Sequence, residues 1–154
     1  MKYTLLEGSE NGKIWDWFYD RFSFLPSVHS KDWPSISPSL PSRTYRFSDY
    51  MFEDDFDGYE DWIHAGLREL CGGEEQLYAL DWQHDCYKFT LNNYGDLPIG
   101  FYPDGDYFIF ISLSLKYGVF THPWEESVCI FGHDLVEVLT VKHAVPFRKE
   151  FRRS

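Results

Sequence analysis

The chain has 154 residues, which is the length of one domain, and we take residues 1–154 as a single domain that forms a core without disulfides or metals. Aromatic residues make up 20% of it, which excludes a disordered polymer, and no apolar run approaches the roughly 18 residues of a membrane span. The net charge of −11 disfavours nucleic acid and anionic membranes as partners and favours basic proteins.

The charge is unevenly distributed. Residues 142–154 contain five basic side chains and one acid, so the chain before them carries a net charge of −15. We expect this basic tail to be frayed. The cysteines at positions 71, 86 and 129 lie far apart, and the N-terminus lacks the apolar run of a signal peptide. Free thiols suit a reducing compartment, so the sequence predicts a cytoplasmic protein.

The first part of the chain predicts a helix, an irregular arm and a strand. Apolar residues at helical spacing predict a helix over residues 11–22. Residues 23–43 are rich in Ser and Pro, which excludes a long helix or a central strand and predicts an arm that wraps around the domain. We expect four apolar side chains to hold this arm, those of Phe24, Leu25, Trp33 and Ile36. Residues 43–48 alternate in polarity, which suits an edge strand.

The remainder predicts two more helices and most of a sheet. One helix starts at Asp57, where Asp57 and Glu60 form a capping box, and stops at Gly72. Strand 107–113 is apolar on both faces and is therefore central and covered on both sides. The other predicted elements are strands over residues 76–82, 86–91 and 127–131 and a helix after Gly132. The class is α+β, with a mostly antiparallel sheet of about five strands packed as a single pair of layers against two or three helices.

The segment Asp81–Tyr87, DWQHDCY, is the first candidate site. His84 and Cys86 are the residue types of a general base and a nucleophile, but an extended strand separates them by about 6.5–7 Å, too far for a hydrogen bond. A metal site formed by His84, Cys86 and His122 lacks the paired ligand spacing of zinc sites. Two other interpretations of this segment remain: its residues have a structural role at the end of a strand, or they form a polar binding pocket.

The second candidate site is His122-Pro123-Trp124-Glu125. A histidine oriented by Glu125 is the residue type of a general base, yet neither a nucleophile nor a phosphate-binding glycine loop accompanies it. Alternatively the segment fixes a corner, in which Pro123 restricts the backbone, Trp124 fills the core and Glu125 binds nearby amides. We assign no catalytic residue, metal ligand or cofactor. The candidates for a binding pocket are Asp81, His84, His122, Trp124 and Glu125.

Residues 49–61, DYMFEDDFDGYED, contain seven acids and no basic residue, interleaved with aromatic residues. The twelve-residue pattern of an EF-hand is absent. Aromatic side chains anchor protein interfaces, and charge accelerates the encounter of oppositely charged proteins. The segment predicts either a solvated loop or a face for a basic protein partner, formed by Glu53, Asp54, Asp55, Phe56 and Tyr59.

Three blocks carry a resemblance to a known family: LDWQHDCYKF at 80–89, YPDGDYFIFIS at 102–112 and GVFTHPWEESVCIFG at 118–132. They resemble an uncharacterised family of short bacterial proteins classed as a domain of unknown function, whose members carry DWQHxCY, GDYY and GHPWExxxCxFG blocks. Thr121 stands where that family usually has Gly, and the family implies no activity. More loosely, the order of the late elements resembles the SUKH superfamily of toxin-immunity proteins, small α+β domains that bind and block a toxin.

Two functions follow. The first is a non-catalytic cytosolic protein-binding domain, an immunity protein or antitoxin that covers a basic toxin domain and binds neither nucleic acid nor membranes. The second is a hydrolytic enzyme or small-ligand domain with Asp81, His84, His122 and Glu125 in one pocket, which requires these side chains to converge. The lack of a catalytic constellation in the sequence favours the first.

Overall fold

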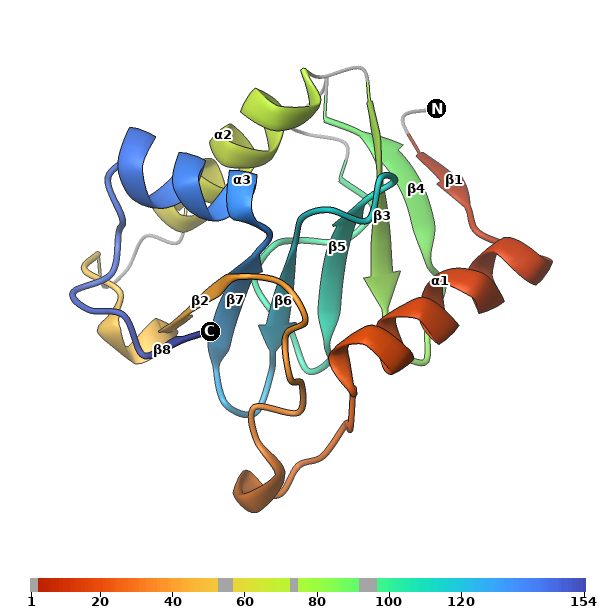
Figure 1. Ribbon diagram of the computed structural model, residues 1–154, viewed down its shortest axis with the longest axis horizontal. Coiled ribbons are helices and arrows are strands. Elements are labelled where there is room, and N and C mark those ends of the chain that lie inside the picture. Colours follow the sequence, from red (N-terminus) through yellow and green to blue (C-terminus); the bar gives the residue numbers. More distant parts are fainter. Residues whose placement is uncertain (1–2, 53–56, 73–74, 92–96) are drawn as a thin grey trace.

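The computed structural model describes residues 3–52, 57–72, 75–91 and 97–154. Its centre is one antiparallel sheet of eight strands in the order β1-β4-β3-β5-β6-β7-β2-β8 (Figure 1). The strands are β1 Tyr3–Leu5, β2 Ser42–Arg46, β3 Gln76–Asp81, β4 Tyr87–Thr90, β5 Phe108–Ser112, β6 Gly118–His122, β7 Ser127–Phe131 and β8 Arg152–Arg153. The helices are α1 Gly8–Phe22, α2 Asp57–Cys71 and α3 His133–Glu137, which continues as a π-helical turn over Val138–Lys142. In these described ranges, no helix has both the length and the apolar character needed to cross a membrane.

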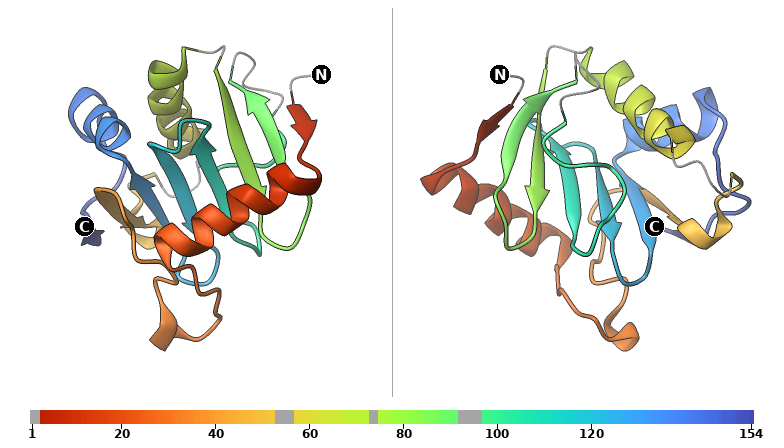
Figure 2. Two further views of the ribbon diagram at one scale, coloured as in Figure 1. Left: turned by 45° about the vertical axis from the view of Figure 1, so that its right-hand side comes forward. Right: turned by 180° about the vertical axis from the view of Figure 1, so that it is seen from behind.

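Helices cover both faces of the sheet. Helix α1 crosses one face, whereas α2 and α3 lie against the other (Figure 2). Successive residues of a strand point to opposite faces, so Ile109 packs with the apolar residues of α1 while Phe110 packs with those of α2. The α+β class and the central place of β5 are confirmed. The prediction of a single pair of layers is wrong, because two separate apolar clusters make three layers.

The sheet has eight strands where the sequence predicts about five. Strands β1 and β8 have three and two residues, too few to show a periodic pattern, and they form by pairing with β4 and β2. Strand β6 lies between the predicted strands 107–113 and 127–131, where the sequence predicts no strand. Strand β2 is not an edge strand, because β8 pairs along its outer side.

The basic tail is ordered at its end, contrary to expectation. The backbone N–H of Phe151 donates a hydrogen bond of 2.8 Å to the carbonyl oxygen of Thr44, and β8 follows. Three basic side chains of the tail form ion pairs, which join Lys142 to Glu69, Arg152 to Glu125 and Arg153 to Glu150. The positive charge of the tail is therefore largely directed at acids of the same chain.

The arm of residues 23–41 packs over the α1 face and past one end of the sheet (Figure 1). Phe24 and Ile36 are buried and Trp33 is half-buried, so these three anchor it as predicted. Leu25 does not, because 59% of it is exposed. In addition to these three side chains, polar contacts to the end of the sheet fix the arm, and these contacts belong to the candidate site.

Candidate functional site

The pocket candidates lie at one end of the sheet. Strand β3 ends at Asp81 and β6 ends at His122, and the register pairs Asp81 with Phe108, Phe108 with Thr121, and His122 with Ser127. The loops over residues 82–86, 97–107 and 123–126 therefore lie side by side at this end, as Figure 1 shows. We call these loops and the adjoining strand ends the sheet end.

Two carboxylates and a histidine meet at the sheet end. Nδ1 of His84 lies 3.0 Å from Oδ1 of Asp81 and 2.8 Å from Oδ2 of Asp106. A turn brings the ring there: the backbone N–H of His84 donates to the carbonyl oxygen of Asp81 at 3.0 Å, and Gln83 within it has a φ of 67°. We call Asp81, His84 and Asp106 the Asp-His-Asp cluster.

The two carboxylates of this cluster are largely shielded from solvent, whereas the imidazole is not. The exposed side-chain fractions are 18% for Asp81, 13% for Asp106 and 65% for His84. Burial raises the pKa of Asp81, against the effect of the hydrogen bond with His84. That same hydrogen bond raises the pKa of His84, since an imidazolium between two carboxylates is favoured over a neutral ring. Without a bound ion, the cluster is therefore held together by an imidazolium between two carboxylates.

Cys86 does not act with His84. Its thiol faces the carbonyl oxygens of Asp81 and His84, each 3.6 Å from Sγ. Burial raises the pKa of this thiol, so it carries a proton at neutral pH. The ring nitrogen of His84 is directed at carboxylates instead, which leaves no activated nucleophile at this place.

His122 is fully buried at the end of β6, and both of its ring nitrogens are engaged. Nδ1 accepts hydrogen bonds from the backbone N–H groups of Trp124 and Glu125, at 3.2 and 3.0 Å. Nε2 therefore carries the proton and donates it to the hydroxyl oxygen of Ser35 at 3.0 Å. Burial lowers the pKa of His122 to about 4. A neutral ring with no free nitrogen holds a corner and is not placed to act as a general base.

The hydroxyl of Ser35 links His122 to a second buried side chain. Its oxygen lies 3.1 Å from the hydroxyl of Tyr107, which also accepts a hydrogen bond of 3.1 Å from the backbone N–H of Ser27. The ring of Trp33 meets that of His122 edge to face, with centroids 5.2 Å apart. Residues of the arm thus bind the ends of β5 and β6, so His122 holds a corner through contacts other than those predicted for Trp124 and Glu125.

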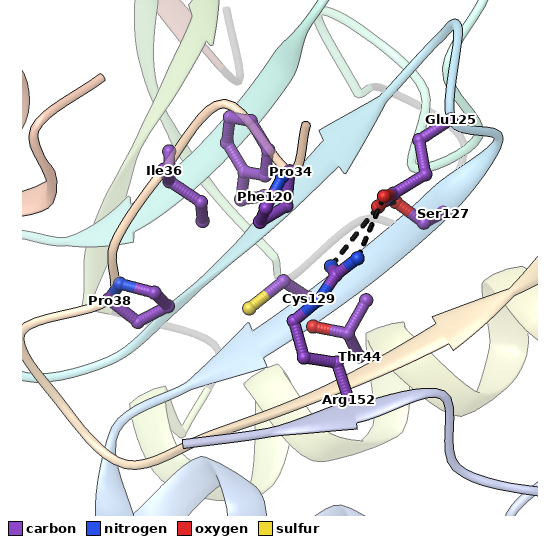
Figure 3. A pocket seen from close by; sticks show the side chains of 9 residues that line it. All are labelled: Pro34, Ile36, Pro38, Thr44, Phe120, Glu125, Ser127, Cys129 and Arg152. Atoms are coloured by element: carbon purple, nitrogen blue, oxygen red, sulfur yellow. Dashed lines mark hydrogen bonds and ion pairs between the residues drawn. The ribbon is translucent and has the colours of Figure 1, made fainter. Parts of the chain in front are cut away.

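Glu125 binds Arg152 of strand β8 and the hydroxyl of Ser127, whereas the sequence predicts that it binds nearby amides. The Arg152 guanidinium donates two hydrogen bonds to its carboxylate, of 2.8 and 3.2 Å (Figure 3). Although burial acts in the opposite direction, the bonds from Arg152 and Ser127 keep the pKa of Glu125 below its usual value. The cavity beside this pair measures about 10 Å³, at the lower limit for one water molecule. It has no room for a substrate.

Two further expectations are changed by the structure. Trp124 does not fill the core, because 37% of it is exposed and its ring rests edge-on against Tyr107. Tyr59 is fully buried and donates a hydrogen bond of 2.7 Å to the carbonyl oxygen of Phe101, so it is not part of an exposed partner face. The other residues predicted for that face, Glu53, Asp54, Asp55 and Phe56, lie outside the described residues.

The four residues of the predicted enzyme pocket are divided between two clusters. Asp81 and His84 meet Asp106, while His122 and Glu125 are engaged by the arm and by β8. Sequence reasoning missed the partners that decide this arrangement, namely Ser35, Asp106, Tyr107 and Arg152. For Asp106 a signal was present, since it follows Gly105 in the GDY block at the start of a predicted strand.

Comparison with known proteins identifies a family whose activity is unknown. A family model described as "Protein of unknown function (DUF2716)" matches residues 5–136. The "Uncharacterized protein YxiI" of Bacillus subtilis (strain 168) is 32% identical over 85 residues, which is 51% of this chain and 52% of that protein, so the chain spans about half the length of this relative. No solved structure matches. The resemblance to SUKH proteins is not supported by these matches and stays a prediction. The chain belongs to the DUF2716 family of unknown function.

Proposed function

We propose that the chain is a non-catalytic protein-binding domain and that its sheet end binds a basic protein. The observation that carries the proposal is the charge of the three neighbouring loops at this end. They contain no lysine or arginine and five acids, which are Asp85, Asp104, Asp106, Glu125 and Glu126. Asp85, Asp104 and Glu126 are exposed, and Asp81 adds a further carboxylate at the end of β3.

Aromatic side chains stand among these acids. Trp124 is 37% exposed, and Trp82, Tyr87 and Tyr102 are partly exposed on the same loops and strand ends. The few residues that dominate the binding energy of protein interfaces are enriched in Trp, Tyr and Arg, while complementary charge accelerates association and selects the partner. An acidic surface with aromatic anchors suits a partner rich in lysine and arginine.

The finer proposal is that the domain is an immunity protein or antitoxin that covers a basic toxin domain in the cytoplasm. The acidic chain and the loose resemblance to SUKH proteins support it. The enzyme alternative has less support, because His122 is neutral and fully hydrogen-bonded and Glu125 is paired with Arg152. Neither group is free to move a proton to or from a substrate.

The test uses the product of the reading frame adjacent to the gene for this chain as the candidate partner. Binding is measured by biolayer interferometry for the wild type and for the triple variant Asp85→Lys, Asp104→Lys and Glu126→Lys. A matched control, Glu75→Lys, Asp134→Lys and Glu137→Lys, makes the same charge change on exposed residues at the opposite end of the sheet.

We expect the sheet-end variant to weaken binding roughly tenfold or more and the control to weaken it about twofold at most, because close charge pairs dominate the electrostatic part of an interface. Equal losses in the two variants would assign the effect to net charge and reject the sheet end as the binding surface. If the adjacent gene product does not bind the wild type, the immunity role is rejected.

A further inference from the structure

The geometry of the Asp-His-Asp cluster points to a second property, which is independent of protein binding. We propose that Asp81, His84 and Asp106 bind one divalent first-row transition metal ion, with Mn²⁺ the best match. Among the described residues, these three offer ligand atoms that all lie within 4.8 Å of one another.

The spacing of the ligand atoms fits an octahedral ion. Bonds of about 2.1 Å place neighbouring ligands of an octahedron roughly 3.0 Å apart, whereas a tetrahedral zinc site separates them by about 3.4 Å. Nδ1 of His84 lies 3.0 Å from the Asp81 oxygen and 2.8 Å from the Asp106 oxygen. Both distances match adjacent corners of an octahedron as well as the hydrogen bonds of the ion-free cluster, so an ion would contact all three atoms from the outer side by displacing the proton on Nδ1.

The donor types narrow the choice of ion. Two carboxylate oxygens suit Mg²⁺, Ca²⁺ and Mn²⁺, whereas an imidazole nitrogen suits transition metals. Ca²⁺ takes six to eight oxygen ligands and Mg²⁺ binds oxygen almost exclusively, so the nitrogen disfavours both. The mixed set of one nitrogen and two oxygens therefore suits a divalent first-row ion that accepts oxygen donors in octahedral geometry, and Mn²⁺ is the ion that we choose for the test.

The two carboxylates are held in place before an ion arrives. Asp81 lies at the end of β3, where its residue is paired with Phe108 of β5. Oδ1 of Asp106 accepts a hydrogen bond of 2.8 Å from the backbone N–H of Tyr107, which directs Oδ2 toward His84. Such outer contacts orient metal ligands and raise affinity. The exposed side of His84 leaves the remaining coordination positions to water.

The test measures Mn²⁺ binding by isothermal titration calorimetry and by pulsed electron paramagnetic resonance. The variants are Asp106→Asn and His84→Ala, and the control is Asp85→Asn, which removes one exposed carboxylate from the same loop without touching the cluster. Circular dichroism of each variant shows that the fold is retained.

We expect one Mn²⁺ per wild-type chain, nitrogen modulation from one imidazole in the resonance spectrum, and a loss of affinity of roughly tenfold or more in both cluster variants. The control should bind within about twofold of the wild type. Mn²⁺ that binds equally well to His84→Ala, or that shows no nitrogen modulation in the wild type, overturns the site, as does an absence of binding at millimolar Mn²⁺. The partner test changes Asp85, Asp104 and Glu126, so the two proposals fail separately.

Discussion

Nε2 of His122 donates a hydrogen bond of 3.0 Å to the hydroxyl of Ser35, a residue 87 positions earlier in the chain. Both residues are buried. Since a buried polar group without a partner costs about 1–3 kcal/mol, the Nε2–H group of His122 requires this acceptor. The contact explains how the arm is held against the end of β6.

The stability of the protein should fall as the pH is lowered toward 4. The unfolded chain binds a proton on His122 near its ordinary pKa of 6.5, but the folded chain binds it only near pH 4. Stability is therefore fully present above pH 6.5 and is lost between 6.5 and 4, by about 2 kcal/mol at pH 5 and about 3 kcal/mol in total. Urea unfolding at pH 7 and pH 5 measures this difference.

His122→Asn is the comparison variant for that experiment. It is less stable than the wild type at pH 7 but lacks the titrating ring, so its free energy of unfolding should change much less between pH 7 and pH 5. Equal changes in the two proteins would show that His122 is not the group responsible.

Replacement of Ser35 by Ala should lower the free energy of unfolding by about 1–3 kcal/mol, because the Nε2–H group of His122 loses its acceptor in a buried place. Ser37→Ala is the control, since Ser37 is exposed and lies in the same arm. Its expected effect is within about 0.5 kcal/mol. A Ser35→Ala variant as stable as the control would mean that the contact does not hold the arm.

Replacement of Arg152 by Lys should loosen β8. Lysine keeps the charge but cannot form the two parallel hydrogen bonds that Arg152 makes with Glu125, whose side chain is only 7% exposed. We expect a loss of about 1–2 kcal/mol and faster hydrogen exchange of the amide of Phe151. Arg153→Lys alters a pair in which the arginine is 63% exposed, so this variant should lose much less stability than Arg152→Lys. Similar exchange in the two variants would contradict the prediction.

Two glycines should respond to alanine in opposite directions. A Cβ atom on Gly118 would overlap the carbonyl oxygen of Phe110 and lie 2.5 Å from Cζ of Phe131, so Gly118→Ala should destabilise the protein by about 3 kcal/mol. A Cβ atom on Gly12 meets nothing within 4 Å, and Gly12 lies in α1. Gly12→Ala should therefore stabilise by about 0.5–1 kcal/mol. Thermal unfolding of both variants checks the signs.

The spacing of apolar residues predicts those helices and strands that are long enough to show a periodic pattern. Apolar spacing located α1 and α2 to within a few residues, and the central place of β5 followed from its two apolar faces. Strands β1 and β8 form because they pair with β4 and β2, so no pattern within their own residues predicts them. A short sequence carries little information about which backbone it will pair with.

The same distinction governs the candidate site. The sequence singled out Asp81, His84, His122 and Glu125 because their residue types are unusual beside strands. Their partners come from the register of β3 against β5 and from the course of the arm and the tail, which join Asp81 to Asp106 and Glu125 to Arg152. Residue types therefore indicated where polar chemistry lies, and only the long-range pairing showed which groups share a cluster.

Strand β8 also has a protective consequence for the whole sheet. Without residues 151–154, the outer side of β2 would present unpaired backbone groups at Ser42 and Thr44, a template to which another copy of the chain can add a strand. Strand β8 consists of Arg152 and Arg153, whose guanidinium groups are paired with Glu125 and Glu150. Charged side chains on an edge strand oppose the addition of a strand from another chain. Strand β8 thus shields part of an open sheet edge as well as completing the sheet.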